Sequence, residues 1–238
     1  MVLEAVVCKH CGRTQQVQRF GKTRGGTQRY RCGDCRRTFV AYYTHKACDP
    51  VVQAQLIQMA INGSGVRDTA RVLHISRNTV SSQLKKKRQV MQVNPKYANK
   101  GLTIKLKVDE MWSFVSCKSF PRWLWWVEDA SNGEVVAFVF GRRTHATFRR
   151  LLALLESAQI QVSGWITDAW WAYFDCLDQS LRVEAKALLQ SLERKHLTLR
   201  TRLKRLTRRT ICFSKSVVVH DTLIGLFINH YFFDFQRS

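Results

Sequence analysis

The pattern of apolar and polar positions divides the chain into a helical part and a later mixed part. In residues 50–88 apolar side chains recur at helical spacing, with a break at residues 62–65, where Asn, Gly, Ser and Gly follow one another. The pattern predicts one helix from about residue 50, a second over residues 67–73 and a third over residues 77–88. Polar and turn-forming residues then predict a linker over residues 93–100.

After residue 101 the pattern changes to short strands that alternate with helices. Alternating apolar residues or continuous apolar runs predict four strands, over residues 102–108, 123–127, 135–140 and 162–167. Apolar residues at helical spacing predict helices over residues 148–155 and about 185–206, and the apolar tail at 223–228 is expected in the core. Strands and helices in this order predict an α/β domain with a mixed sheet.

Four of the eight cysteines lie in the first 35 residues, in two C-x2-C pairs separated by 20 residues: Cys8, Cys11, Cys32 and Cys35. Paired cysteines at this spacing are typical of one tetrahedral zinc site, whereas the alternative is a set of reduced core cysteines. A segment of about 46 residues buries little apolar surface, so the metal would stabilise its fold. Four thiolates leave no open position on the ion, which predicts a structural zinc and leaves His10 as a neighbour rather than a ligand.

The charge of the chain is strongly positive, with 39 Lys and Arg against 17 Asp and Glu and a net charge of +22. Nucleic acid is favoured over a membrane surface as the anionic partner, because binding phosphates releases condensed counterions. No run of 18 apolar residues would span a bilayer, and no apolar signal segment begins the chain. We therefore expect a cytoplasmic, nucleoid-associated protein with reduced thiols. The arginines beside the second cysteine pair either contact DNA or only form a basic surface: Arg29, Arg31, Arg36 and Arg37.

Residues 66–80 fit a helix-turn-helix, in which Ser76 is placed to cap the second helix. The alternative is an αα-hairpin with no DNA role, but the net charge and the neighbouring cysteine pairs favour DNA binding. The second helix would present short polar side chains to a DNA groove and lysines to the phosphates. The candidate DNA-binding residues are Arg77, Asn78, Thr79, Ser82, Lys85, Lys86 and Lys87.

Three of the scarce acidic residues lie where a sheet and a helix could bring them together. Asp109 and Asp168 each end a predicted strand, and Glu193 lies at the edge of the apolar stripe of the last long helix. On local evidence alone, each is better explained as a surface or capping acid, and the case depends on the three together. Three carboxylates that meet would bind two Mg²⁺ or Mn²⁺ ions, because hard oxygen ligands suit these cations. Two such ions about 4 Å apart activate a hydroxyl and stabilise the leaving oxygen in phosphodiester cleavage.

Further candidates for contact with DNA lie near Glu193 and among the tryptophans. His196 and Arg200 lie at i+3 and i+7 from Glu193, on the same side of the helix, and could contact the reacting phosphate. The alternative for both is a solvated basic face. The seven tryptophans are expected mainly in the core, with Trp170 or Trp171 a candidate for stacking on an unpaired base.

The order of these features resembles the insertion-sequence-one family of transposases over nearly the whole chain. The matching segments are the cysteine pairs with Gln28–Arg31, the helix-turn-helix with Met59–Gly63, and the segments Asp109–Trp112, Phe140–Thr144, Thr167–Trp170, Leu192–Arg194, Phe213–Ser216 and His220–Asp221. The resemblance implies a ribonuclease-H-like fold and an aspartate–aspartate–glutamate triad at Asp109, Asp168 and Glu193. It also implies an element that moves by cutting and joining at its terminal inverted repeats. Ala169 stands where the family commonly has glycine, and His196 where it commonly has asparagine.

These observations predict three parts: a zinc ribbon over residues 1–46, a helix-turn-helix domain over residues 47–92 and, after the linker, a ribonuclease-H-like catalytic domain over residues 101–238. The predicted activity is that of a DNA transposase with structural Zn²⁺, catalytic Mg²⁺ or Mn²⁺, and double-stranded DNA as its partner. Pairing two element ends requires at least two copies, which predicts a homo-oligomer on DNA. The alternatives are a DNA-binding repressor, an inactive transposase remnant, or a nuclease that cuts without joining.

Overall fold

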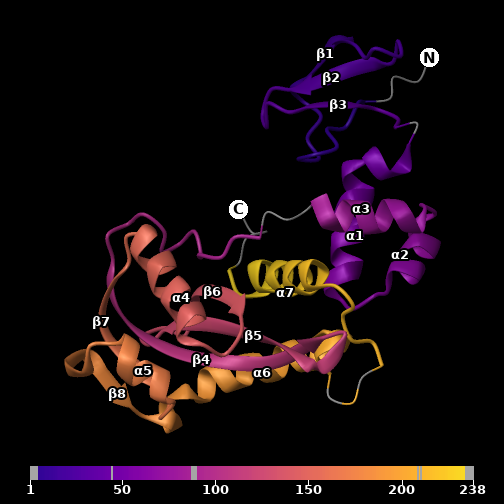
Figure 1. Ribbon diagram of the computed structural model, residues 1–238. Coiled ribbons are helices and arrows are strands. Elements are labelled where there is room, and N and C mark those ends of the chain that lie inside the picture. The colour runs from indigo at the N-terminus through magenta and orange to yellow at the C-terminus, as the bar shows by residue number, and fades with distance from the viewer. Residues whose placement is uncertain (1–4, 44, 87–89, 208, 210, 234–238) are drawn as a thin grey trace. The chain divides into compact units, whose positions relative to one another are not determined.

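The computed structural model describes residues 5–43, 45–86, 90–207, 209 and 211–233. The chain divides into two compact units, drawn in Figure 1. The first comprises the chain up to Ala60 together with Ser64–Gln83, and the second comprises Ile61–Gly63 and the chain from Leu84 onward. Lys87, a predicted DNA-binding residue, lies outside the described residues. Among the described helices, none is long and apolar enough to cross a membrane.

The first unit begins with a small antiparallel sheet of three strands. The strands are β1 (Val17–Lys22), β2 (Gln28–Cys32) and β3 (Thr38–Val40), in the order β1-β2-β3. Its core consists of Phe39 with two buried cysteines, Cys8 and Cys32, and Tyr30 packs against it. So small a core buries little apolar surface, which agrees with a fold that depends on a bound metal.

Helices follow this sheet in the order that the sequence predicts. They are the short 3-10 turn η1 (Lys46–Cys48), α1 (Pro50–Ile61), α2 (Val66–Leu73) and α3 (Arg77–Lys86). α2 ends at His74, whose φ of 53° lies in the left-handed region and turns the chain toward α3. The Ser76 hydroxyl accepts the backbone N–H of Thr79 at 3.0 Å, so the predicted cap of the second helix is confirmed.

The second unit is built on a five-stranded mixed sheet in the order β6-β5-β4-β7-β8. The strands are β4 (Thr103–Val115), β5 (Cys117–Asp129), β6 (Val135–Gly141), β7 (Gln161–Thr167) and β8 (Arg182–Glu184). β4, β5 and β6 are antiparallel neighbours, whereas β7 and β8 continue the sheet in parallel with β4. The expected α/β, ribonuclease-H-like fold is confirmed.

Helices cover both faces of this sheet. They are α4 (His145–Ser157), α5 (Trp171–Cys176), α6 (Gln190–Arg202) and α7 (Val217–Tyr231), with the short turns η2 (Gln179–Leu181), η3 (Lys186–Leu189) and η4 (Lys204–Leu206). Alternation along a strand sends neighbouring residues to opposite faces. Val108 and Trp125 therefore pack with Phe148 of α4 on one face, whereas Trp126 contacts His196 of α6 on the other.

Three expectations about element boundaries are corrected. Asp109 does not end its strand, because β4 continues to Val115 and turns at Ser116, with φ of 71°, into β5. The long helix expected at residues 185–206 is divided into η3, α6 and η4. The segment 93–100 packs on the sheet rather than forming a free linker, since the buried Asn94 side chain donates to the Val135 carbonyl at 3.0 Å.

Candidate active site

Asp109 lies within β4, and Asp168 directly follows β7, the parallel neighbour of β4. Lys107 of β4 pairs with Ile166 of β7, and continuing this register places Asp109 level with Asp168. Each carboxylate is held by one backbone donor. Asp109 accepts the N–H of Glu110 at 2.9 Å, and Asp168 accepts the N–H of Trp170 at 2.9 Å. The two aspartates that the sequence singled out are therefore brought together by strand pairing.

Helix α6 carries Glu193 and packs on the face of the sheet that bears Asp109. Leu192 and Leu199 are fully buried, and the imidazole of His196 stacks on Trp126 with ring centroids 5.1 Å apart and an interplanar angle of 10°. Trp126 is the residue of β5 that pairs with Asp109. Glu193, one turn before His196, is exposed, so its carboxylate is open to solvent and to a ligand.

The electrostatics connect the three carboxylates. Burial, together with the negative charges of Glu110, Asp168 and Glu193, raises the pKa of Asp109 to about 7. Repulsion of this kind is relieved when a cation binds, so the donor set fits a hard divalent metal. Among the described residues, however, only the four N-terminal cysteines form a group of three or more ligand atoms within 4.8 Å of one another. The carboxylates of the triad are therefore spread more widely than a closed metal site.

His196 occupies a different place from the one its sequence position suggested. Its side chain is buried, and its Nε2 accepts the indole N–H of Trp126 at 2.8 Å. Burial lowers the pKa of His196 to about 3, so the imidazole is neutral at physiological pH. A neutral imidazole that accepts at Nε2 carries its proton on Nδ1, and this atom lies 3.6 Å from Oδ2 of Asp109. This placement favours contact with Asp109 over contact with DNA.

Glu110 forms a second buried acidic centre on the opposite face from Asp109, and the sequence analysis gave it no role. Its carboxylate accepts the Tyr173 hydroxyl at 2.8 Å and pairs with Arg143 at 2.5 Å. The Arg143 guanidinium lies over the rings of Trp123 and Trp170, 5.2 and 4.8 Å from their centroids. Trp170 also donates its backbone N–H to Asp168, so the Glu110 cluster helps to hold this carboxylate in position. The only sequence signal for it was the position of Glu110 beside Asp109.

Glu128 forms another buried cluster that sequence reasoning missed. Its fully buried carboxylate pairs with Lys107 at 3.2 Å, pairs with Lys195 and accepts the hydroxyl of Ser191. Ser191 and Lys195 lie on α6, two residues before and two residues after Glu193. The cluster therefore fixes the turn of α6 that carries Glu193. An acidic residue at the end of a strongly apolar strand was the signal that could have found it.

The four N-terminal cysteines meet as their spacing predicts. The Sγ atoms of Cys8 and Cys35 lie 3.7 Å apart, and those of Cys11 and Cys32 lie 3.6 Å apart. A tetrahedral zinc with Zn–S bonds of about 2.3 Å needs sulfur–sulfur distances of about 3.8 Å. The donor set and its dimensions therefore fit zinc, and all four ligand atoms lie within 4.8 Å of one another.

The second helix of the helix-turn-helix exposes most of the predicted DNA-binding residues. Solvent-exposed side chains on α3 are those of Arg77, Asn78, Ser82, Lys85 and Lys86. Thr79 is half-buried, and its hydroxyl lies 2.8 Å from that of Ser76, so it takes part in the helix cap. Arg200 on α6 is half-buried.

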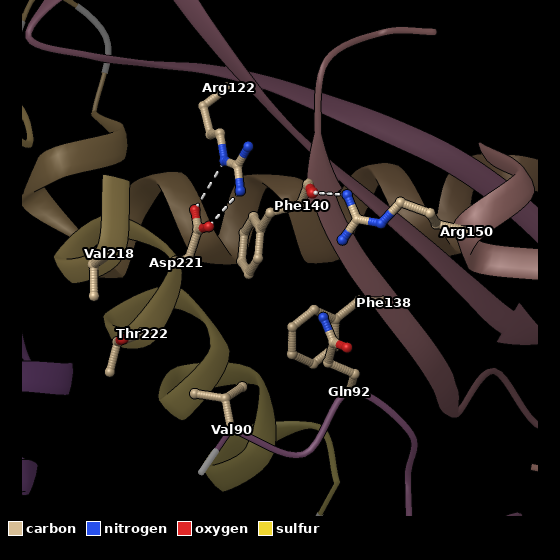
Figure 2. Close-up of a pocket in the computed structure, with 9 residues that line it drawn as sticks. All are labelled: Val90, Gln92, Arg122, Phe138, Phe140, Arg150, Val218, Asp221 and Thr222. Atoms are coloured by element: carbon tan, nitrogen blue, oxygen red, sulfur yellow. Dashed lines mark hydrogen bonds and ion pairs between the residues drawn. The ribbon is translucent and has the colours of Figure 1, made fainter. Parts of the chain in front are cut away.

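A cavity of about 400 Å³ between α7 and the strands β5 and β6 contains none of the predicted site residues. Figure 2 shows its charged side chains engaged with the protein itself. Arg122 donates to Asp221 through Nε at 3.0 Å, and Arg150 donates to the Phe140 carbonyl at 3.3 Å. The cavity therefore carries no argument for a second catalytic centre.

Comparison with known proteins identifies relatives of both halves of the chain. Residues 102–234, more than half of the chain, match the family described as IS1 transposase, and residues 43–88 match the InsA C-terminal domain. The insertion element iso-IS1n protein InsB of Shigella dysenteriae is 44% identical over 128 residues, which cover 53% of this chain and 95% of the relative. The insertion element IS1 protein InsB of Shigella flexneri is 45% identical over 127 residues, 52% of this chain and 95% of the relative. An InsB protein of Escherichia coli K12 is 43% identical over 127 residues, 52% of this chain and 75% of the relative. The chain belongs to the IS1 transposase family.

Proposed function

We propose that this transposase binds the terminal inverted repeats of an insertion element and catalyses metal-dependent cleavage and strand transfer at Asp109, Asp168 and Glu193. The observation that carries the proposal is the strand register, which sets Asp109 level with Asp168, together with the repulsion from Glu193 that reaches Asp109. Three carboxylates at one site repel one another, and a cation bound between them relieves this repulsion.

Two bound Mg²⁺ or Mn²⁺ ions would supply the Lewis acid that activates the attacking hydroxyl and stabilises the leaving oxygen. The protein's own residues hold the ligands in place. His196 directs its Nδ1–H at Asp109, and Trp126 fixes the tautomer by donating to Nε2. The N–H of Trp170, two residues further along the chain, orients Asp168. His196 is thus a positioning residue in this proposal, and not a DNA ligand.

DNA recognition is assigned to the exposed side of α3 and to the region around α6. Asn78 and Ser82 are short and polar, as base contacts require, whereas Arg77, Lys85 and Lys86 suit phosphates. Arg200 lies on the same side of α6 as Glu193 and would contact DNA close to the reacting phosphate. Two element ends are joined in one reaction, so at least two DNA-bound copies are required.

Strand transfer in vitro tests this function. Purified protein would be mixed with labelled DNA that carries candidate element ends and Mg²⁺ or Mn²⁺, alongside Asp168→Asn and the matched control Asp178→Asn. Asp178 only caps a short 3-10 turn, through the N–H of Ser180 at 2.9 Å. Joined product from the wild type and the control, with a loss of at least 100-fold in Asp168→Asn, is the expected result. Cleavage without joining would indicate a nuclease, DNA binding without cleavage a repressor or an inactive remnant, and equal activity in both variants would contradict the triad.

The four cysteines are proposed to hold one structural zinc ion. Metal analysis of the purified protein should give about one zinc per chain, reduced to a small fraction in Cys32→Ser. A chain that retains its fold after complete zinc removal would contradict this assignment, because a core of this size depends on the metal.

A further inference from the structure

A second pocket, of about 490 Å³, lies between the end of the β4–β5 hairpin and the segment that follows α6. It contains none of the three carboxylates of the triad. Its lining combines aromatic and cationic side chains: Trp112, Phe114, Lys118, Arg200, Arg205 and Arg209. No acidic side chain is among the described residues that line it. Aromatic rings beside several cations, with no acid, are a combination that suits a nucleotide.

Arg205 supplies the strongest sign that an anion belongs in this pocket. Its guanidinium donates to the hydroxyl of Ser214 at 2.9 Å, and it takes part in none of the ion pairs found among the described residues. Ser214 in turn lies 2.8 Å from Nδ1 of His220. Burial lowers the pKa of His220 to about 3, so this neighbour is neutral, and burial also lowers the pKa of Arg205. A partly buried cation among neutral partners is stabilised when a negative ligand enters.

Trp112 provides a stacking surface at the same place. Its side chain is 38% exposed although it is large and apolar. Phe114 supports it, with ring centroids 5.6 Å apart, and Phe213 supports Phe114 at 5.7 Å. Phe114 and Phe213 therefore hold the Trp112 ring in place, while its indole remains accessible to a ligand. Exposed tryptophan beside arginine is the arrangement on which unpaired bases stack.

The separations along α6 and β4 indicate how far the pocket lies from the triad. Arg200 follows Glu193 by seven residues, which is about 10 Å along α6 on the same side of the helix. Trp112 follows Asp109 by three residues of β4, about 10 Å along the strand, and by alternation it leaves the sheet on the opposite face, so that DNA would reach it past the edge of β4. At about 3.4 Å per base step, this distance corresponds to roughly three nucleotides of a DNA strand. β7 pairs with β4 only as far as Lys107, so the edge of β4 between the two positions is not covered by β7.

We propose that this pocket binds an unpaired nucleotide of the DNA strand, a few positions from the phosphodiester in the active site, with its base on Trp112 and its phosphate against Arg205 and Arg200. The inference rests on the proposed function, since it assumes that DNA occupies the triad. It adds a local requirement for melted or single-stranded DNA at the cleavage position. Duplex DNA alone would leave Trp112 without a partner, because paired bases are already stacked.

The test compares two DNA probes in EDTA, where no cleavage occurs. One is a blunt duplex. The other, called the forked probe, is the same duplex with three unpaired nucleotides at one 3′ end, and the middle one of these is 2-aminopurine. We expect the wild type to bind the forked probe about tenfold more tightly than the blunt one and to quench the 2-aminopurine fluorescence. Trp112→Leu should lose both effects while keeping its affinity for the blunt duplex. Trp112→Phe should retain much of the quenching, because phenylalanine still stacks.

Charge variants complete the experiment. Arg205→Gln should weaken binding of the forked probe by about fivefold or more, whereas Arg149→Gln, an exposed arginine of α4 outside the pocket, should not change the preference. Equal affinity of the wild type for both probes, or equal quenching by the wild type and Trp112→Leu, would overturn the proposal. The affinity for blunt DNA reports that each variant is folded. Because the binding assay needs no catalysis, its result can be interpreted even if the protein fails to catalyse strand transfer.

Discussion

Asp109 differs from an ordinary surface carboxylate in ways that pH can reveal. Burial and three neighbouring acids raise its pKa to about 7 when no metal is bound. The unfolded chain would release this proton near pH 4, so between about pH 4 and 7 the folded state holds a proton that the unfolded state lacks. Without metal, the stability that Asp109 contributes is therefore greatest at low pH and is lost as the pH rises from about 4 to 7.

Asp109→Asn isolates that effect. In EDTA the variant should be more stable than the wild type, and its advantage in the free energy of unfolding should be larger at pH 8 than at pH 5 by about 2 kcal/mol. Chemical denaturation at the two pH values measures the difference. The variant must be compared with the wild type at each pH, because His196 and His220 also make stability depend on pH. Their pKa values are lowered to about 3, so both residues destabilise the fold as the pH falls below 6.5. Glu156→Gln, at an exposed site on α4, should show no such pH dependence.

At the scale of elements, the position of α6 depends on one buried carboxylate. Glu128 on β5 pairs with Lys107 on β4 and Lys195 on α6, and it accepts the Ser191 hydroxyl. Glu128→Gln would leave both lysines without their counter-charge, which costs about 3 kcal/mol in a buried pair. Because Ser191 and Lys195 flank Glu193, the variant should also need a severalfold higher Mg²⁺ concentration for half-maximal cleavage.

Two measurements separate these consequences. Denaturation reports the stability of the fold, and a metal titration of the cleavage rate, at a temperature where the variant is folded, reports the position of Glu193. Glu184→Gln is the matched control, since the Glu184 side chain is 48% exposed where it pairs with the buried Arg182, and its loss should change stability by less than about 1 kcal/mol. An unchanged Mg²⁺ requirement in Glu128→Gln would mean that α6 keeps its position without this cluster.

The same element scale explains what the sequence could and could not predict. Periodicity located α2, α3 and four of the eight described strands, and cysteine spacing located the sulfur cluster, because each of these signals is local. The hairpin beyond Asp109 was missed because polar residues interrupt its apolar pattern. Ser113 is buried there because its hydroxyl has two partners, the Arg122 carbonyl at 2.5 Å and Nε2 of His220 on α7 at 3.0 Å. Asn94 likewise looked like part of a linker until the Val135 carbonyl, 41 residues away, accounted for its burial.

The site residues also divide into those that local sequence patterns predict and those that depend on contacts between distant parts of the chain. Asp109, Asp168 and Glu193 were candidates from strand ends and a helix stripe, and β4–β7 pairing brings the two aspartates together. Their supports were not predictable. Glu128 meets Lys195 across 67 residues, and Glu110 meets Tyr173 across 63. His196 was predicted as a DNA contact from its helical position, but the ring of Trp126, 70 residues away, draws it into the core.

At the scale of the whole molecule, we expect the net charge of +22 to dominate the affinity for DNA. Phosphate contacts release counterions, so the logarithm of the binding constant falls with the logarithm of the salt concentration, with a slope of about −0.9 for each phosphate neutralised. This slope counts phosphate contacts without regard to sequence. Base contacts contribute instead to the ratio between specific and non-specific affinity.

The two kinds of contact assigned to α3 can therefore be told apart. Replacing both Lys85 and Lys86 with Ala should reduce the magnitude of the salt slope by about 2 and weaken binding to all sequences alike. Asn78→Ala should leave the slope unchanged and lower the preference for element ends over unrelated DNA by about tenfold. Fluorescence anisotropy between 50 and 300 mM salt, as a rough working range for such slopes, measures both quantities. The control replaces two exposed cations of the second unit, Lys100 and Arg149, with Ala. The salt slope could instead fall as much in this control as in the α3 variant. That result would mean that DNA binds to cations over the whole surface, with no preference for α3.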